Sequence, residues 1–147
     1  MKTRTMLALL VMLAFRLSVQ GQTATALNEG LGISYSSSTN SFTVSWWGRA
    51  GRTYFIQQSD DLIHWNYLPL IESGADDVIS WGFSTAASRA FVRLRYTDIA
   101  TSDPQNADFD GDGLSNIMEL QNGSDPLAAD SHGTGTPDGW AAGYGLE

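Results

Sequence analysis

One pattern between residues 32 and 96 leaves few folds open to this chain: short runs of alternating side chains, separated by turn residues. In the run 41–47, Phe42, Val44 and Trp46 fall on every second position. A period of two is typical of a β-strand that buries one face. We predict six strands, over residues 32–36, 41–47, 53–59, 64–70, 77–83 and 90–96.

The spacing of these runs predicts how the strands are arranged. They recur roughly every ten residues without helical periodicity between them, which favours antiparallel neighbours over parallel strands joined by helices. We therefore predict an all-β fold. It consists of an antiparallel β-sandwich over residues 27–100, followed by an acidic segment, 101–147, that contains one short helix.

The sandwich region also resembles a known class of module. The order VSWW, GRTYFIQQSDDLIHWNYL and FVRLRY resembles small fibronectin type III-like or immunoglobulin-like β-sandwiches of secreted bacterial proteins, over about seventy residues. Such modules are mostly spacers or adhesive units, and some bind sugars. The resemblance carries no catalytic residue onto this chain.

Residues 1–26 have the plan of a secretory signal peptide. Lys2 and Arg4 precede a ten-residue apolar run, and small and polar residues follow. That run is well short of the ~20 residues needed to span a bilayer. We predict cleavage after Gly21 or after Ala26, and a mature protein that is secreted or held at the cell surface without being embedded in the membrane.

Composition excludes several classes of function. The chain has no cysteine, so disulfides and thiolate metal sites are unavailable. Removing the signal leaves five arginines and no lysine against sixteen acids, a net charge of −11, which disfavours nucleic acid and anionic membranes as partners. His64 and His132 are far apart in the sequence, which disfavours a zinc site or a catalytic triad.

Negative charge is concentrated in the last third of the chain, where residues 98–147 include ten acids and no Lys or Arg. The stretch 108–119 reads DFDGDGLSNIME. Carboxylates about 4 Å apart repel by roughly 1 kcal/mol per pair in water, and more in a partly buried loop, so a cation is the expected counter-charge.

This stretch matches the calcium-loop pattern D-x-[DN]-x-[DN]-G-x5-E along its whole length. Gly113 permits the sharp bend that turns the ligands inward. Hard oxygen ligands favour Ca²⁺ over transition metals, with Mg²⁺ the weaker alternative. The predicted ligands are the side chains of Asp108, Asp110, Asp112, Asn116 and Glu119 and the backbone carbonyl of Leu114.

The loop leads into a predicted helix of about two turns, with Ser115 as its N-cap and Asn122–Gly123 as its end. The apolar residues around it should pack onto the calcium unit itself or onto the sandwich. These residues are Phe109, Leu114, Ile117 and Leu120.

No helix is predicted before the loop, because Pro104 and turn formers precede it. DFDGDGLSN followed by GSDPLAADS therefore resembles thrombospondin type 3 repeats of secreted bacterial proteins, which bind calcium and act as stiff acidic spacers. Dockerins share the loop, but commonly carry an aliphatic residue where this chain has Ser115. A second copy begins at Asp130 with His132 and Thr134 in place of acids, so we expect it to bind metal weakly or not at all.

These observations predict a secreted, non-enzymatic, calcium-binding module with a structural or adhesive role. One alternative is a carbohydrate-binding module that uses exposed tryptophans, with a polysaccharide or another extracellular protein as partner. A dockerin-like interaction module is another. A glycosidase that uses paired carboxylates such as Asp60 and Asp76 is the least favoured, because nothing in the sequence indicates a cleft.

Overall fold

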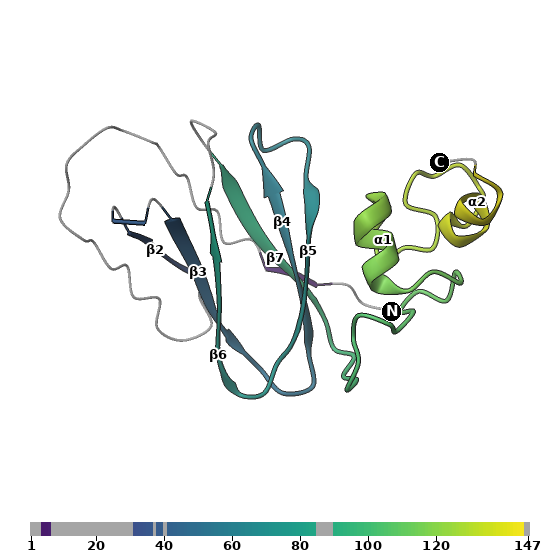
Figure 1. The fold of residues 1–147 in the computed structure, drawn as a ribbon. Coiled ribbons are helices and arrows are strands. Elements are labelled where there is room, and N and C mark those ends of the chain that lie inside the picture. Colours follow the sequence, from purple (N-terminus) through teal and green to yellow (C-terminus); the bar gives the residue numbers. More distant parts are fainter. Residues whose placement is uncertain (1–3, 7–30, 37, 40, 85–89, 146–147) are drawn as a thin grey trace.

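The computed structural model describes residues 4–6, 31–36, 38–39, 41–84 and 90–145, which form seven strands and two short helices (Figure 1). The elements are β1 Arg4–Met6, β2 Gly32–Ser36, β3 Ser41–Gly48, β4 Thr53–Ser59, β5 Asn66–Ser73, β6 Asp77–Phe83, β7 Phe91–Thr97, α1 Asn116–Asn122 and α2 Asp138–Tyr144.

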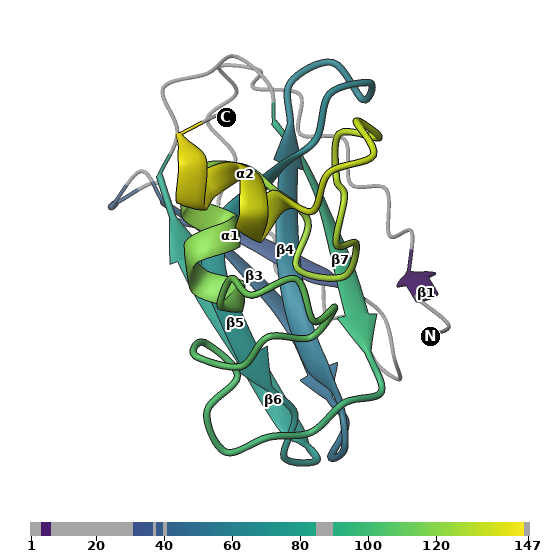
Figure 2. The same cartoon turned by 90° about the vertical axis from the view of Figure 1, so that its right-hand side faces the viewer.

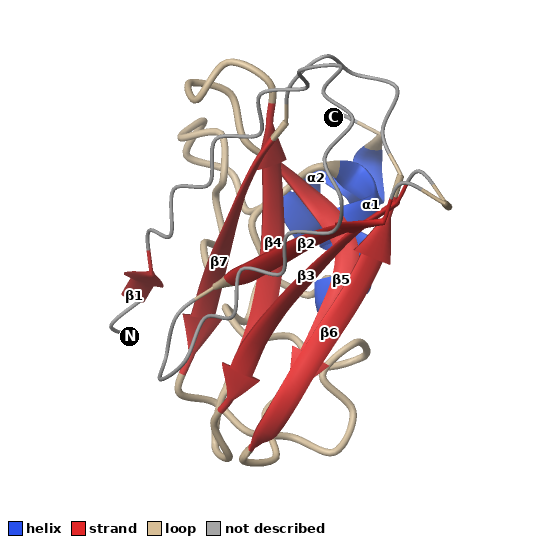
Figure 3. Ribbon diagram, turned by 90° about the vertical axis from the view of Figure 1, so that its left-hand side faces the viewer, coloured by secondary structure: helices blue, strands red, loops and turns tan. Residues whose placement is uncertain are grey.

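The strands form two sheets, ordered β1-β7-β4-β5 and β2-β3-β6, and every pairing is antiparallel. The two sheets face each other as the layers of a sandwich (Figure 3). The predicted all-β sandwich is confirmed. The short helix predicted after the acidic loop is present as α1, and α2 is a second one that the sequence analysis did not predict.

Alternate residues of the central strands fill the space between the sheets. Trp46 on β3 is only 4 % exposed, whereas its neighbour Trp47 points to the other face and is 44 % exposed, as the pleat of a strand requires. The buried cluster consists of Val44, Trp46, Tyr54, Ile56, Val92, Leu94 and Tyr96.

Strand β4 is unusual because both of its faces are buried. Ile56 faces the core between the sheets, while Phe55 packs on the opposite side with Ile71, Leu120 and Leu127. Helix α1 covers this outer face of the β4-β5-β7 sheet, and α2 lies beyond α1 (Figure 2). The acidic segment is thus packed onto the sandwich through an apolar layer of its own.

Strand β5 begins and ends later than the sequence predicts. The predicted run starts at residue 64, but the backbone N–H groups of Ile63 and His64 both donate to Oδ1 of Asp61, at 2.8 Å each, and hold this part as a turn. Pro69 lies within β5, where the register against β4 shifts. A proline is tolerated there because β5 is an edge strand.

Strand β1 pairs with β7 and lies within the predicted signal segment. Both predicted cleavage positions, after Gly21 and after Ala26, fall outside the described residues. After cleavage, we expect β7 to become an edge of its sheet. Among the described residues, no helix has the length and apolar character needed to cross a bilayer.

Candidate metal centre

The acidic loop is shaped by two glycines. Gly111 and Gly113 take left-handed φ values of 80° and 99°, a conformation that strains other residues. Their N–H groups donate to the two carboxylate oxygens of Asp108, at 2.6 and 3.0 Å. The bend predicted at Gly113 is therefore present, with a second one at Gly111.

This bend brings three predicted ligands together. Oxygens of Asp108, Asp110 and Asp112 lie within 4.8 Å of one another, a spacing that allows one ion to contact all three. One oxygen of Asp110 is buried without a hydrogen-bond partner in the described part of the protein. Burial, with the charges of Asp112 and Asp108, raises the pKa of Asp110 to about 6.

Glu119 is the most unusual side chain of the site. It lies on α1 and is fully buried, yet neither of its carboxylate oxygens has a hydrogen-bond partner among the described residues. Burial, reinforced by the nearby charges of Asp110 and Asp112, raises the pKa of this carboxyl group to about 9. A buried polar group without a partner is costly, and a bound positive charge would offset that cost.

The two remaining predicted ligands differ in what they do. Asn116 is fully buried, and its side chain closes the loop: Oδ1 accepts a bond from the N–H of Phe109, and Nδ2 donates to the carbonyl of Pro104 at 2.7 Å. Leu114 buries its side chain and donates its N–H to Oδ1 of Asp112. Both remain predicted ligands, with Asn116 having a clear structural role as well.

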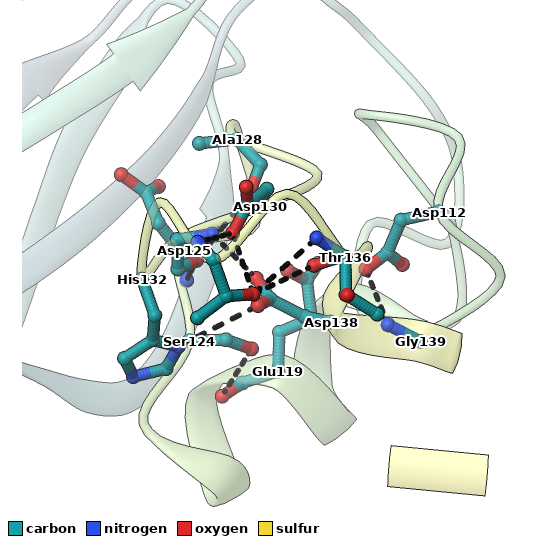
Figure 4. A network of polar contacts seen from close by, with 12 residues as sticks. Asp112, Glu119, Ser124, Asp125, Ala128, Asp130, His132, Thr136, Asp138 and Gly139 are labelled. Atoms are coloured by element: carbon teal, nitrogen blue, oxygen red, sulfur yellow. Dashed lines mark hydrogen bonds and ion pairs between the residues drawn. The ribbon is translucent and has the colours of Figure 1, made fainter. Parts of the chain in front are cut away.

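The second copy contributes an acid that is not among the predicted ligands. Asp130 stays in its own loop, where it accepts bonds from the N–H groups of Thr134 and Gly135. Asp138, at the start of α2, is 4 % exposed. One of its oxygens lies within 4.8 Å of oxygens of Asp112 and Glu119 (Figure 4).

A polar cluster next to the metal centre ties the acidic segment to the sandwich. Asp125 accepts a hydrogen bond from the hydroxyl of Tyr67, at 2.8 Å, and forms an ion pair with Arg95 of β7. Burial, followed by the charge of Asp125, raises the pKa of Tyr67. The sequence offered no signal for this cluster, because its members are far apart along the chain.

Trp47, Trp65 and Trp81 have different surroundings. Trp47 lies on the outer face of β3, opposite Val78 of β6. Trp65 lies under the guanidinium of Arg93, 4.1 Å from its ring centroid, and Trp81 packs against the sandwich core. Trp140 and Tyr144 on α2 are 49 % and 68 % exposed, with ring centroids 4.4 Å apart. The carbohydrate-binding alternative stays a prediction.

The two carboxylates considered for a glycosidase, Asp60 and Asp76, lie in turns. Asp76 has a left-handed φ of 56° in the turn before β6, and its Oδ1 accepts a bond from the N–H of Ala50. Asp60 follows the end of β4, and the glycosidase alternative stays a prediction.

No family model, no curated protein and no solved structure matches this chain. The likeness to sandwich modules and to thrombospondin type 3 repeats therefore remains a prediction from the sequence.

The raised pKa of Glu119 predicts how the stability of the metal-free protein depends on pH. Glu119 holds its proton up to about pH 9 in the folded, metal-free protein, but only to about 4.5 when unfolded. The folded state therefore binds more protons in this window, and the free energy of unfolding should fall as pH rises from about 4.5 to 9. Denaturant unfolding in chelator at pH 5, 7 and 9 measures this; a rise in stability over the range would contradict the assignment.

Proposed function

We propose that the protein is a secreted, non-enzymatic, calcium-binding module in which the ion stabilises the acidic segment on the β-sandwich. The observation that supports this best is Glu119, a fully buried carboxyl group with two unpartnered oxygens beside other acids. The converging side chains of Asp108, Asp110 and Asp112 would hold the ion. Glu119, the carbonyl of Leu114 and the side chain of Asn116 are the further ligands that the loop pattern predicts.

The donor set favours calcium. The ligating atoms of the acids are carboxylate oxygens. Such hard ligands suit Ca²⁺ and Mg²⁺ rather than zinc or copper. Glu119 can offer both oxygens, since neither is engaged in the described structure. Bidentate coordination suits the larger Ca²⁺ better than Mg²⁺, which requires a compact octahedral shell.

The position of Glu119 links ion binding to the packing of the sandwich. Its neighbour Leu120 on α1 belongs to the apolar cluster that contains Phe55 of β4. An ion that draws Glu119 into the loop would also hold α1 against the sheet. We infer a structural or adhesive role outside the cytoplasm, in which calcium at extracellular concentrations keeps the two parts joined.

Thermal unfolding with and without calcium tests this function. Extracellular sites of this kind work at ~0.1–1 mM calcium. At ten times the dissociation constant, the ion should add about 1.4 kcal/mol to the free energy of unfolding. Melting curves of the mature protein should therefore shift upward in calcium relative to chelator.

Asp112→Ala should remove that shift, because Asp112 belongs to both acidic groups at the site. Asp77→Ala, which removes an exposed acid on β6, serves as the control and should keep it. Identical curves for the unmodified protein in calcium and chelator would refute the proposed function.

A further inference from the structure

We propose that the protein binds two divalent cations, and that the second is held between the two copies by Asp112, Glu119 and Asp138. This proposal rests on the proposed function, because the first cation is the one assigned there. The second site differs from the loop site in taking a ligand from the second copy, which has His132 and Thr134 in place of two acids. Its ligand class is the same, a hard divalent cation such as Ca²⁺.

The geometry separates two groups of acids. Asp108, Asp110 and Asp112 form one, and Asp112, Glu119 and Asp138 form the other, each with oxygens within 4.8 Å of one another. Asp112 belongs to both groups. Glu119, which the loop pattern also assigns to the first cation, would contact both ions. Asp108 is exposed and Asp138 buried, so the groups extend from the surface inward.

Hydrogen bonds aim the carboxylates of the second group. The N–H of Ser131 donates to Oδ2 of Asp138 at 2.9 Å, and the N–H of Gly139 donates to Oδ2 of Asp112 at 2.6 Å. The two acids are thus held by the backbone, while Glu119 keeps both oxygens free and is fully buried. His132 lies 3.5 Å from Asp138, with its ring largely exposed.

Charge favours two ions over one. The two groups together contain five carboxylates, which carry a charge of −5 when ionised. One divalent ion would leave −3 in a partly buried site, whereas two would leave −1. Because repulsion between charges grows as water is excluded, the second ion gives the better balance. A carboxylate that bridges two ions, as Asp112 is placed to do, keeps their separation short.

This arrangement explains why a degenerate second copy still has a defined place in the fold. Its own loop presents His132 and Thr134 where the first copy has acids. Gly139 then brings α2 close to the first loop, since a Cβ at this position would lie 2.4 Å from the backbone oxygen of Asp112. The second copy closes over the first instead of forming a separate site.

Counting bound ions tests the proposal. Metal-stripped protein is equilibrated with calcium by dialysis, and bound metal is measured per chain. We expect two ions in the unmodified protein and one in Asp138→Asn. Asp130→Asn removes the same charge from the second copy but outside both groups, and should retain two.

Gly139→Ala is a second variant that keeps every ligand. Alanine suits a helix better than glycine, so α2 should persist, but the added Cβ must push α2 away from Asp112. We expect this variant to hold one ion, as Asp138→Asn does.

The possible outcomes separate the two proposals. One ion in the unmodified protein, or two retained in Asp138→Asn, would overturn the second site while leaving the proposed function intact. Loss of both ions from Asp138→Asn and from Gly139→Ala would show that the second copy only shapes the first loop. That result would also overturn the second site. No ion in the unmodified protein would refute the proposed function itself.

Discussion

Replacing Phe55 with alanine is expected to lower the free energy of unfolding by about 3–5 kcal/mol, the range for a large aromatic side chain removed from a packed core. Phe55 is completely buried, although it lies on the face of β4 that points away from the other sheet. Its ring meets those of Tyr67 and Phe109 edge-on, at centroid distances of 6.1 and 6.2 Å. The effect should be this large because the acidic segment covers the sheet.

Denaturant unfolding measures the change, and Val78→Ala is the control. Val78 lies on an exposed face, with 58 % of its surface accessible, so its truncation should change stability by no more than about 0.5 kcal/mol. If Phe55→Ala were as mild as Val78→Ala, the sheet face would not be covered in solution. The described packing of the acidic segment on the sandwich would then be wrong.

Replacing Glu119 with leucine is expected to have opposite effects in the absence and presence of calcium. Without metal, the change removes a buried carboxyl group that has no hydrogen-bond partner in the described structure. Relieving that cost should stabilise the metal-free protein by about 1–3 kcal/mol. With metal, the variant lacks the ligand that can supply two oxygens, so calcium affinity should fall by at least about 100-fold.

Unfolding curves in chelator and calorimetric titration with calcium check the two halves of this prediction. Glu119→Gln is the matched variant, because it keeps the shape of the side chain but cannot take on the negative charge that binds the ion. It should lose calcium binding without the gain in metal-free stability. A leucine variant that is less stable than the unmodified protein in chelator would show that Glu119 serves packing rather than metal binding.

Much of the fold was predictable because the strands carry a local signal. The period of two in β3 puts Val44 and Trp46 on one face and leaves Trp47 on the other, as observed. Strand β4 was predictable as a strand, but not as one buried on both faces, because its outer cover comes from Leu120 and Leu127 in a distant part of the chain.

The metal centre also has a part that was predictable from local sequence and a part that was not. The loop from Asp108 to Asp112 is set by neighbouring residues, so its spacing alone predicted that its carboxylates would converge. The place of Asp138 depends on how α2 folds back onto the loop, which no local pattern records. The sequence therefore predicted a weakened second site. In the structure, the buried Asp138 of the second copy lies beside Asp112 and Glu119 of the first copy.

The central claim is that the buried acids around Glu119 bind a divalent cation, and direct titration of the unmodified protein tests it most closely. Metal-stripped protein at pH 7 is titrated with calcium in a calorimeter. We expect saturable binding with a dissociation constant at or below about 1 mM, abolished in Glu119→Leu. Absence of saturable binding up to about ten times that concentration would contradict the claim.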